Sequence, residues 1–391
     1  MNNPTNADRK AAATPLPPGR PFRADQVGSL LRPQPLKEAH ARALKGEVDA
    51  ATLHGIEDRF IREVVMLQQD IGLHAITDGE FRRTLFHADF LGQLEDGCGA
   101  RSVAFEFRRP AEAASGQAAA SFLPPGVKIN GKVRRVKPIE VEPFRFLAAT
   151  TRRTPKQAIP SPTMLLRGGR RGVDAAAYPD FDQFLEDVAV AYRQEIADLA
   201  AVGCRYLQLD DTNFAYLCDP RIVEAMRAEG EDVEGIADRF ASVINAAIAD
   251  RPKDMLVCIH VCRGNDRGRS AAQGGYEPVA DVLFNRTNVD AYFLEYDTEA
   301  AGSFEPLRHL PKNKTVVLGL ISSKAPELAD AGDIVRQIEA AARFAPLENL
   351  CLSPQCGFAS GFRGNPLTED QERRKLEQTV SIAERVWATA R

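Results

Sequence analysis

Eight short apolar segments, separated by longer amphipathic stretches, constrain the fold of this 391-residue chain more than any other feature. Each segment is nearly continuous in Val, Ile, Leu and aromatic residues, as expected for parallel strands that are buried on both faces. The segments are residues 27–31, 74–77, 159–165, 206–210, 256–260, 291–295, 315–320 and 350–353. Parallel strands need long crossover connections, so we expect the stretches between them to be helical.

The intervening stretches repeat their apolar residues with the period of a helix. In residues 181–201 the apolar side chains from Phe184 to Leu199 lie on one side, and Gly203 ends the pattern. Further helices are predicted at residues 52–71, 221–249, 334–344 and 368–390. The alternation indicates a (β/α)8 barrel, or TIM barrel, with right-handed crossovers. An open doubly wound sheet is the alternative, although no G-x-G-x-x-G motif follows the first segment.

Two regions interrupt this pattern. Residues 1–22 are rich in Pro, Ala, Asn and Thr without apolar periodicity, so we expect an extended N-terminal arm. Residues 98–147 lie between the second and third segments, and within them residues 127–129 and 133–141 alternate like a β-hairpin. We interpret this region as an insertion on the barrel, so that residues 23–391 form a single (β/α)8 domain.

Charge and hydropathy exclude several classes of protein. The chain has 50 Lys+Arg and 54 Asp+Glu, and its net charge of −4 argues against a nucleic-acid-binding surface, which usually leaves a basic footprint. No apolar run approaches the roughly 20 residues that a membrane span requires, and the N-terminus lacks the apolar core of a secretory signal. We therefore expect a cytoplasmic protein. Its seven Cys are an odd number, which points to metal or thiol chemistry rather than a disulfide framework.

Ionisable and thiol groups follow the fifth, sixth and eighth segments, where a barrel places its active site. His260 and Cys262 form an H-x-C pair, and residues two apart on a strand point to the same side. Imidazole and thiolate are ligands that zinc prefers. Glu295 and Cys356 would complete a four-coordinate Zn²⁺ site. For an isolated H-x-C pair, the alternative is a buried His beside a small apolar Cys.

A zinc site with two thiolates and one carboxylate is electron-rich, so it suits uptake of an incoming thiol better than generation of hydroxide. Such a site points to thiol alkylation. Asp210 and Glu80, at the ends of other segments, are candidates for binding a substrate ammonium group, and Ser29 for binding a substrate carboxylate. The alternative for Asp211, and less so for Asp210, is the N-cap of a helix.

At these residues the chain resembles the cobalamin-independent methionine synthase family, specifically its catalytic C-terminal barrel in the short, stand-alone core form. The matching stretches follow the family's order over most of residues 23–390 and include RADQVGSLLRP, AITDGEFRR, YLQLDDTNFAYLCDP, CIHVCRGN, YFLEYD and LSPQCGFASGFRG. The resemblance implies methyl transfer to zinc-bound homocysteine, which yields methionine. It implies zinc ligands at His260, Cys262, Glu295 and Cys356, and homocysteine contacts at Ser29, Glu80 and Asp210.

The methyl-donor half of the site departs from the family pattern. The long family members have about twice this length, with an N-terminal barrel that is missing here. They carry a Trp soon after the T-M-L run, where this chain has Leu166-Arg167, and a histidine in the pattern D-I-H-S-P, where it has Lys324. The resemblance therefore makes Lys324 a candidate proton donor. The donor itself stays open between a methyltetrahydrofolate and a methyl-corrinoid protein, and a homodimer or an accessory protein is a further possible partner.

Two other functions are compatible with the pattern. A zinc-dependent thiol alkyltransferase of the epoxyalkane–coenzyme M transferase type would use the same metal chemistry on another thiol. Its sulfonate substrate would require Arg or Lys, whereas an amino acid thiol requires carboxylates such as Glu80 and Asp210. A non-catalytic zinc-binding barrel is the third hypothesis, although a structural zinc does not usually lie at a rim lined with substrate-type groups.

Overall fold

The computed structural model describes residues 16–17, 19–96, 101–106 and 126–387. Six parallel strands lie in the order β10-β9-β8-β7-β6-β5, so each strand pairs with its neighbour in sequence. They are β5 (Gln157–Pro160), β6 (Tyr206–Asp211), β7 (Leu256–Val261), β8 (Ala291–Glu295), β9 (Thr315–Ile321) and β10 (Leu350–Pro354). Nearly all their residues are buried, as the continuous apolar segments predict.

The sheet closes into a ring through short and irregular pairings. Strand β1 (Ala75–Ile76) pairs in parallel with β4 (Thr154–Pro155), which leads directly into β5. On the other side, the Leu352 amide donates to the Arg23 carbonyl at 2.9 Å, and the Leu30 amide donates to the Gly79 carbonyl at 3.1 Å. Residues 23–30 therefore bridge β10 and β1. The predicted TIM barrel is confirmed.

Two of the predicted strands have different bounds in the structure. Residues 27–31 form no regular strand, because Gly28 adopts a φ of 137° and its carbonyl accepts a hydrogen bond from the Thr77 hydroxyl at 2.7 Å. The predicted strand at 159–165 ends at Pro160, and the chain continues as a 3₁₀ helix, η1 (Pro162–Leu166). Ser161 caps that helix by accepting from the Thr163 amide, so the change of structure has a local cause.

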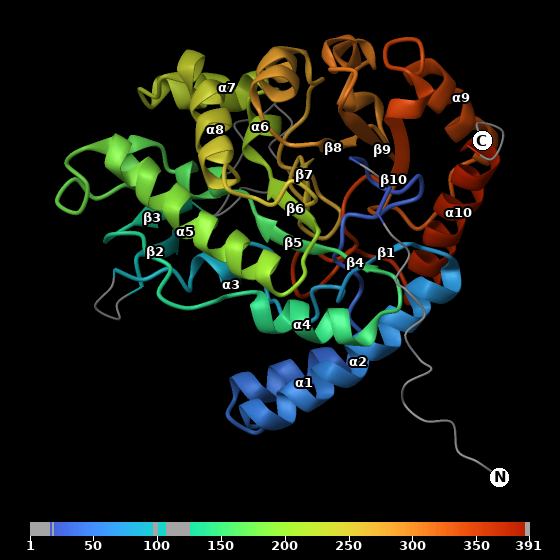
Figure 1. The fold of residues 1–391 in the computed structure, drawn as a ribbon, viewed down its shortest axis with the longest axis horizontal. Coiled ribbons are helices and arrows are strands. Elements are labelled where there is room, and N and C mark those ends of the chain that lie inside the picture. The colour runs from blue at the N-terminus through green and yellow to red at the C-terminus, as the bar shows by residue number, and fades with distance from the viewer. Residues whose placement is uncertain (1–15, 18, 97–100, 107–125, 388–391) are drawn as a thin grey trace, which may run out of the picture.

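The helices surround the strands, and α1 and α2 form an antiparallel pair at one edge of the molecule (Figure 1). They are α1 (Gln34–Leu44), α2 (Ala50–Ile71), α3 (Ala88–Leu91), α4 (Val141–Thr150), α5 (Phe181–Ala201), α6 (Asn213–Tyr216), α7 (Pro220–Ala228), α8 (Val233–Ala247), α9 (Ala331–Ala341) and α10 (Glu369–Trp387). The single helix predicted at 221–249 is two, because Gly230 is left-handed at φ 78° and Asp232 caps α8. No helix of the described residues is long and apolar enough to cross a membrane.

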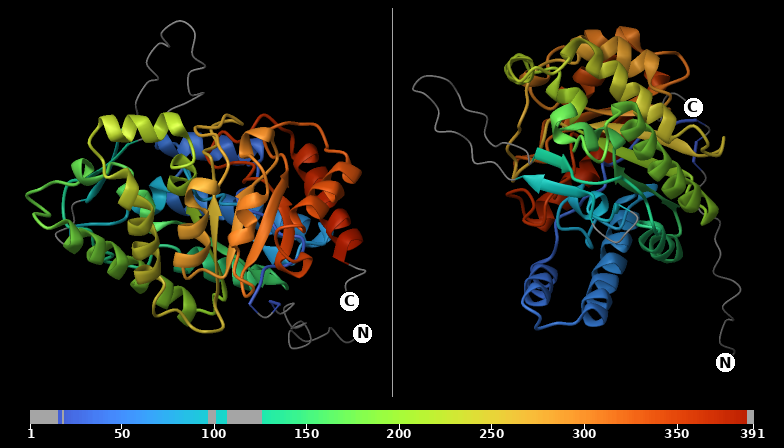
Figure 2. Two further views of the ribbon diagram at one scale, coloured as in Figure 1. Left: turned by 90° about the horizontal axis from the view of Figure 1, so that it is seen from above. Right: turned by 90° about the vertical axis from the view of Figure 1, so that its left-hand side faces the viewer.

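The insertion contains an antiparallel pair, β2 (Val103–Glu106) and β3 (Gly126–Ile129), whose strands lie side by side in Figure 2. The predicted partner of β3, residues 133–141, is not a strand. Glu195 accepts the amides of Ile139 and Glu140, and α4 begins at Val141. Residues 97–100 and 107–125 of this region, and 1–15 and 18 of the predicted arm, lie outside the described residues. Phe22, the last residue of that arm, is buried in the core.

A buried ion pair closes the end of the barrel opposite the strands' carboxyl ends. The Lys156 ammonium lies 3.0 Å from Asp25 Oδ1, and both side chains are fully buried. Tyr206 donates its hydroxyl to Asp25 Oδ2 at 2.6 Å, so the aspartate is well satisfied. Apolar side chains of the inner strand faces, including Phe293 and Val317, pack around this pair. Substrate access is therefore expected at the carboxyl end alone.

Candidate metal centre

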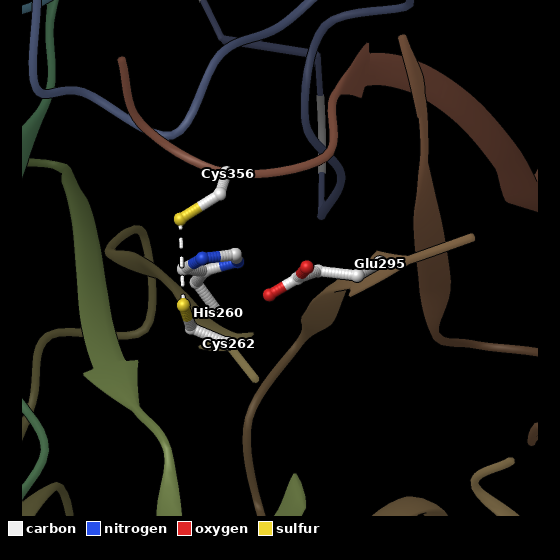
Figure 3. Close-up of side chains that lie close together, drawn as sticks. All are labelled: His260, Cys262, Glu295 and Cys356. Atoms are coloured by element: carbon white, nitrogen blue, oxygen red, sulfur yellow. Dashed lines mark hydrogen bonds between the residues drawn. The ribbon is translucent and has the colours of Figure 1, made fainter. Parts of the chain in front are cut away.

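Four predicted ligands converge at the carboxyl end of the barrel (Figure 3). His260 lies on β7 and Glu295 ends β8, while Cys262 directly follows β7 and Cys356 comes two residues after the end of β10. One potential ligand atom of each residue lies within 4.8 Å of the others, and all four residues are buried. The Cys262 amide donates to the Asp211 carbonyl at 2.7 Å, which extends strand pairing and points Cys262 to the same side as His260.

His260 offers one ring nitrogen to this site. Its Nδ1 lies 3.3 Å from the Phe293 carbonyl oxygen, which can only accept, so Nδ1 carries the proton of the neutral ring. The buried Nε2 makes no hydrogen bond of regular geometry within the described structure, although the nearby Cys356 sulfur interacts with this ring and, despite burial, raises the pKa of His260. A backbone carbonyl on one nitrogen and a free lone pair on the other is the arrangement found in metal-ligating histidines. This orphaned nitrogen argues against a satisfied core histidine.

The two thiols face one another across the site. Their Sγ atoms are 3.4 Å apart, well beyond the roughly 2.05 Å of a disulfide. The hydrogen bond between them raises the pKa of Cys262, as does burial, and lowers the pKa of Cys356, which His260 lowers further. Asn265 Nδ2 also lies 3.8 Å from the Cys356 sulfur. One thiol is thus already disposed to ionise, and thiolates are the form that binds metal.

Glu295 is held as an anion by three donors. Its Oε1 accepts the Arg263 amide at 2.6 Å, while Oε2 accepts Lys324 Nζ at 3.1 Å and Gln355 Nε2 at 3.0 Å. Burial alone would raise the pKa of Glu295, but Lys324, Arg263 and His260 outweigh it and lower the pKa to about 2. The donor set of one imidazole, two thiols and one ionised carboxylate fits Zn²⁺.

A pocket opens beside these residues. It is lined by Val27, Ser29, Glu80, Phe86, Asp210, Asp211, Thr212, His260, Cys262, Gly264, Asn265, Cys356 and Ser360. The structure therefore brings the three predicted substrate residues, Ser29, Glu80 and Asp210, to the same cavity as three of the predicted metal ligands. Its lining contains no Arg or Lys among the described residues.

The two pocket carboxyls that are predicted to bind substrate have raised pKa values. Burial, with the nearby Asp210 and Asp78, raises the pKa of Glu80 to about 8 against the opposing effect of Arg83. Burial likewise raises the pKa of Asp210 to about 6, although Gln208 donates to its Oδ1 at 2.7 Å. Glu80 Oε2 is buried without a hydrogen-bond partner in the described structure. A bound ammonium group would supply that partner and favour the ionised carboxylates.

Ser29 is tied to the loop that carries Cys356. The Phe358 amide donates to the Ser29 carbonyl at 2.9 Å, and the Ser29 hydroxyl lies against Gly357 so closely that a Cβ there would overlap it.

We expect Gly357→Ala to destabilise the protein by about 1–3 kcal/mol, as overpacking does. It should also weaken metal binding, because Cys356 is the preceding residue. Thermal denaturation and metal analysis test this, with Gly55→Ala as the control for loss of a glycine, because Gly55 has open space at its Cβ position and no positive φ.

Lys324 and Asp211 do not lie where substrate chemistry requires them. Lys324 is absent from the pocket lining, and its Nζ donates to Glu295 and to the Ser270 hydroxyl at 2.7 Å. The Lys324 ammonium is therefore engaged by the candidate metal ligand Glu295 and not by the pocket. Asp211 lines the pocket, and its Oδ1 accepts the Phe214 amide in the first turn of α6. The N-cap residue of that helix is Thr212, so the N-cap predicted at Asp211 is off by one residue.

Sequence reasoning missed the residues that orient the ligands. Arg263 is buried, and its guanidinium donates to the Glu295 carbonyl at 2.8 Å and to the Gly274 carbonyl at 2.7 Å. Gln355 links Glu295 to Ser323, whose amide donates to it at 2.7 Å. Both follow or precede a predicted ligand directly in sequence. Their position next to a predicted ligand was the one sequence feature that could have indicated Arg263 and Gln355. Polar residues at strand ends are too common for this feature to identify them.

The chain is similar to known proteins over nearly its whole length. The family model described as the catalytic domain of cobalamin-independent synthase matches residues 22–385. YxjH of Bacillus subtilis (strain 168), described as an uncharacterized protein, is 43% identical over 372 residues, which cover 94% of this chain and 95% of the relative. A 5-methyltetrahydropteroyltriglutamate–homocysteine methyltransferase of Synechococcus is 22% identical, and the match spans 86% of this chain but only 40% of that protein.

Two solved structures are similar over nearly the whole chain. One is a candidate vitamin-B12 independent methionine synthase from Listeria monocytogenes, with a TM-score of 0.74 and 36% identity, covering 94% of this chain and 98% of the other. The other is a B12-independent methionine synthase from Shewanella sp. W3-18-1 in complex with selenomethionine, with a TM-score of 0.68 and 19% identity, covering 97% of both chains. The second supports the fold alone.

Proposed function

This chain belongs to the family of cobalamin-independent synthase catalytic domains, and we propose that it is a zinc-dependent methyltransferase that methylates the thiol of homocysteine to form methionine. The observation that supports this best is the convergence of an imidazole, two thiols and a carboxylate within 4.8 Å of one another at the open end of the barrel. Zinc held there by His260, Cys262, Glu295 and Cys356 would lower the pKa of a substrate thiol and make its sulfur nucleophilic at neutral pH.

The pocket supplies groups for the other end of an amino acid thiol. Glu80 and Asp210 would hold the substrate ammonium, since both are buried carboxyls on the pocket wall and one oxygen of Glu80 has no partner in the described structure. Ser29 would donate its hydroxyl to the substrate carboxylate. These contacts would orient homocysteine with its sulfur toward the metal ligands, because both sets of residues line one cavity.

The methyl donor is proposed only as a class: a methyltetrahydrofolate or a methyl-corrinoid protein. Lys324 does not favour the folate route, because its ammonium is engaged by Glu295 and Ser270 and the residue does not line the pocket. A proton for a departing folate nitrogen would then have to come from another group or from water. A homodimer or an accessory protein, and a cytoplasmic location, stay predictions.

The pocket disfavours the two alternative functions. A sulfonate thiol such as coenzyme M would need a cation, yet the lining carries three carboxyls and no Arg or Lys among the described residues. Arg83, whose guanidinium lies 3.4 Å from the Glu80 carboxylate, is engaged by Glu80, Glu140 and the Ala158 carbonyl. A purely structural zinc would need neither an open pocket nor the raised pKa values of Glu80 and Asp210.

Homocysteine binding is the direct test. A free thiol has a pKa of about 8.5, so its capture as thiolate should release close to one proton per site at pH 7. With homocysteine the ionisation of Glu80, whose pKa is about 8 in the free protein, adds to this release, whereas N-acetylhomocysteine, which has no ammonium group, reports the thiol proton alone. Calorimetry in two buffers of different ionisation enthalpy measures this release on the zinc-loaded protein. Coenzyme M should bind at least about 10-fold more weakly. Tighter binding of coenzyme M would overturn the choice of homocysteine, and absence of proton release with any thiol would overturn the thiolate chemistry.

The donor is then identified by turnover. Homocysteine is supplied with monoglutamyl methyltetrahydrofolate, polyglutamyl methyltetrahydrofolate or methylcobalamin, and methionine is measured. We expect methionine from at least one of these donors. A protein that takes up homocysteine with proton release but yields no methionine from any of them would contradict the proposed donor classes.

A further inference from the structure

Lys324 lies beside the candidate metal centre, where its ammonium contacts the Glu295 carboxylate. Its Nζ is 3.1 Å from Glu295 Oε2 and 2.7 Å from the Ser270 hydroxyl, and its side chain is 14% exposed. This ion pair with Glu295 places a mostly buried cation directly on a candidate ligand. A buried cation placed on one ligand invites a role in the chemistry of that ligand.

The hydrogen bonds of Glu295 leave little of the carboxylate free. A carboxylate offers about four lone-pair positions, two on each oxygen. On Oε2 both are engaged, one by Lys324 Nζ and the other by Gln355 Nε2. On Oε1 the Arg263 amide engages one at 2.6 Å. A single lone pair, on Oε1, is therefore available to a metal.

We propose that Lys324 is a positioning residue that keeps Glu295 a one-oxygen zinc ligand and so preserves a coordination position for the substrate thiol. The inference rests on zinc binding at the four-residue site of the proposed function. If Oε2 lost its Lys324 bond, it could turn to the metal as a second oxygen ligand. The carboxylate would then compete with the incoming thiol for coordination.

Charge balance supports the same role. A Zn²⁺ with two thiolates, one carboxylate and a neutral imidazole carries one excess negative charge, and a substrate thiolate would add another. Burying uncompensated charge is costly. Lys324 and Arg263 are cations that lower the pKa of Glu295, and Lys324 contacts its carboxylate directly. Loss of Lys324 should therefore weaken thiolate binding more than it weakens zinc binding.

Lys324→Met tests the proposal, because methionine keeps the length of the side chain and removes its charge and its donors. We expect the zinc-loaded variant to bind homocysteine at least about 10-fold more weakly, to release fewer protons on binding, and to retain its zinc in competition with a chromophoric chelator. In the cobalt-substituted protein, the visible bands should lose intensity, as they do when coordination rises from four to five. Lys324→Arg should restore part of the affinity.

Two further variants distinguish loss of the Lys324 contact with Glu295 from a general loss of protein stability. Ser270→Ala removes the hydroxyl that anchors Nζ and should change homocysteine affinity in the same direction, to a smaller extent, even if Lys324→Met folds poorly. Lys314→Met removes another partly buried lysine, whose Nζ donates to the carbonyls of Phe284 and Thr287 away from the pocket, and should leave homocysteine binding unchanged.

The outcomes distinguish the inference from the proposed function. Wild-type homocysteine affinity and an unchanged cobalt spectrum in both Lys324→Met and Ser270→Ala would overturn the positioning role. So would a loss of homocysteine binding that only follows a loss of zinc. If the wild-type protein itself holds no zinc or releases no proton with homocysteine, the proposed function fails before any variant is compared.

Discussion

Replacing Cys262 or Cys356 with serine is expected to remove most of the zinc from the purified protein. Serine keeps nearly the same shape but its hydroxyl stays protonated at neutral pH, so the site loses one of its two thiolates. Structural zinc sites are worth roughly 12 kcal/mol in all, so one ligand accounts for about 3 kcal/mol, or more than about 100-fold in affinity. Elemental analysis and chelator competition measure this, against about one zinc per chain in the wild type.

A matched control lies on the same strand. Cys258 is buried on β7, two residues before His260, and packs in the apolar interior of the barrel. Cys258→Ala should leave a small cavity and lower stability without changing the zinc content. Wild-type zinc content in both serine variants, or equal zinc loss in Cys258→Ala, would contradict the assigned ligands.

Asp210→Asn is expected to weaken homocysteine binding about 10- to 100-fold while leaving zinc content unchanged. A hydrogen bond to a charged group is worth about 1.5–3 kcal/mol, and asparagine keeps the shape of the side chain without the charge. N-acetylhomocysteine, which has the thiol but no ammonium, should bind the wild type and the variant equally. The comparison isolates the ammonium contact from the metal chemistry.

The same contact predicts a pH dependence. In the free protein the pKa of Asp210 is about 6 and that of Glu80 is about 8, so each carboxyl is neutral below its value and charged above it. The preference for homocysteine over N-acetylhomocysteine should therefore increase as the pH rises from about 5 to about 8. Since thiol ionisation is common to both ligands, it cancels in the ratio. A pH-independent ratio, or equal loss of both ligands in Asp210→Asn, would contradict the ammonium site.

Most of the barrel could be predicted from the chain because its strands are buried on both faces. Such strands read as continuous apolar segments, and β6 to β10 lie within a residue or so of the predicted bounds. The strands predicted at residues 27–31 and 133–141 are wrong, because apolar residues are also buried in segments without regular secondary structure. At Gly28 a positive φ ends the strand, and at Ile139 and Glu140 the amides bind the distant Glu195 instead of a β partner.

The site divides in a similar way. The H-x-C pair on one strand, with Glu295 and Cys356 at the ends of others, was enough to predict the ligand set, since a barrel brings its carboxyl strand ends to one mouth. Lys324 could not be placed from its sequence position. A lysine in that loop could line the pocket or contact the Glu295 carboxylate, and the path of the loop decides between these positions. Hydrogen bonds of Ser270 to Lys324 and of Gln355 to Glu295 help to hold the observed arrangement.

The sequence by itself therefore determined the fold class, the candidate ligands and the candidate substrate contacts of this protein. This was possible because local residue patterns reveal which strands are buried and where each strand ends. Only the tertiary structure decided how those groups are held. The lone pair left on Glu295, the free nitrogen of His260 and the raised pKa values of Glu80 and Asp210 arise from burial and from contacts between residues far apart in the chain. Such contacts have no local signature, since each depends on where another segment passes.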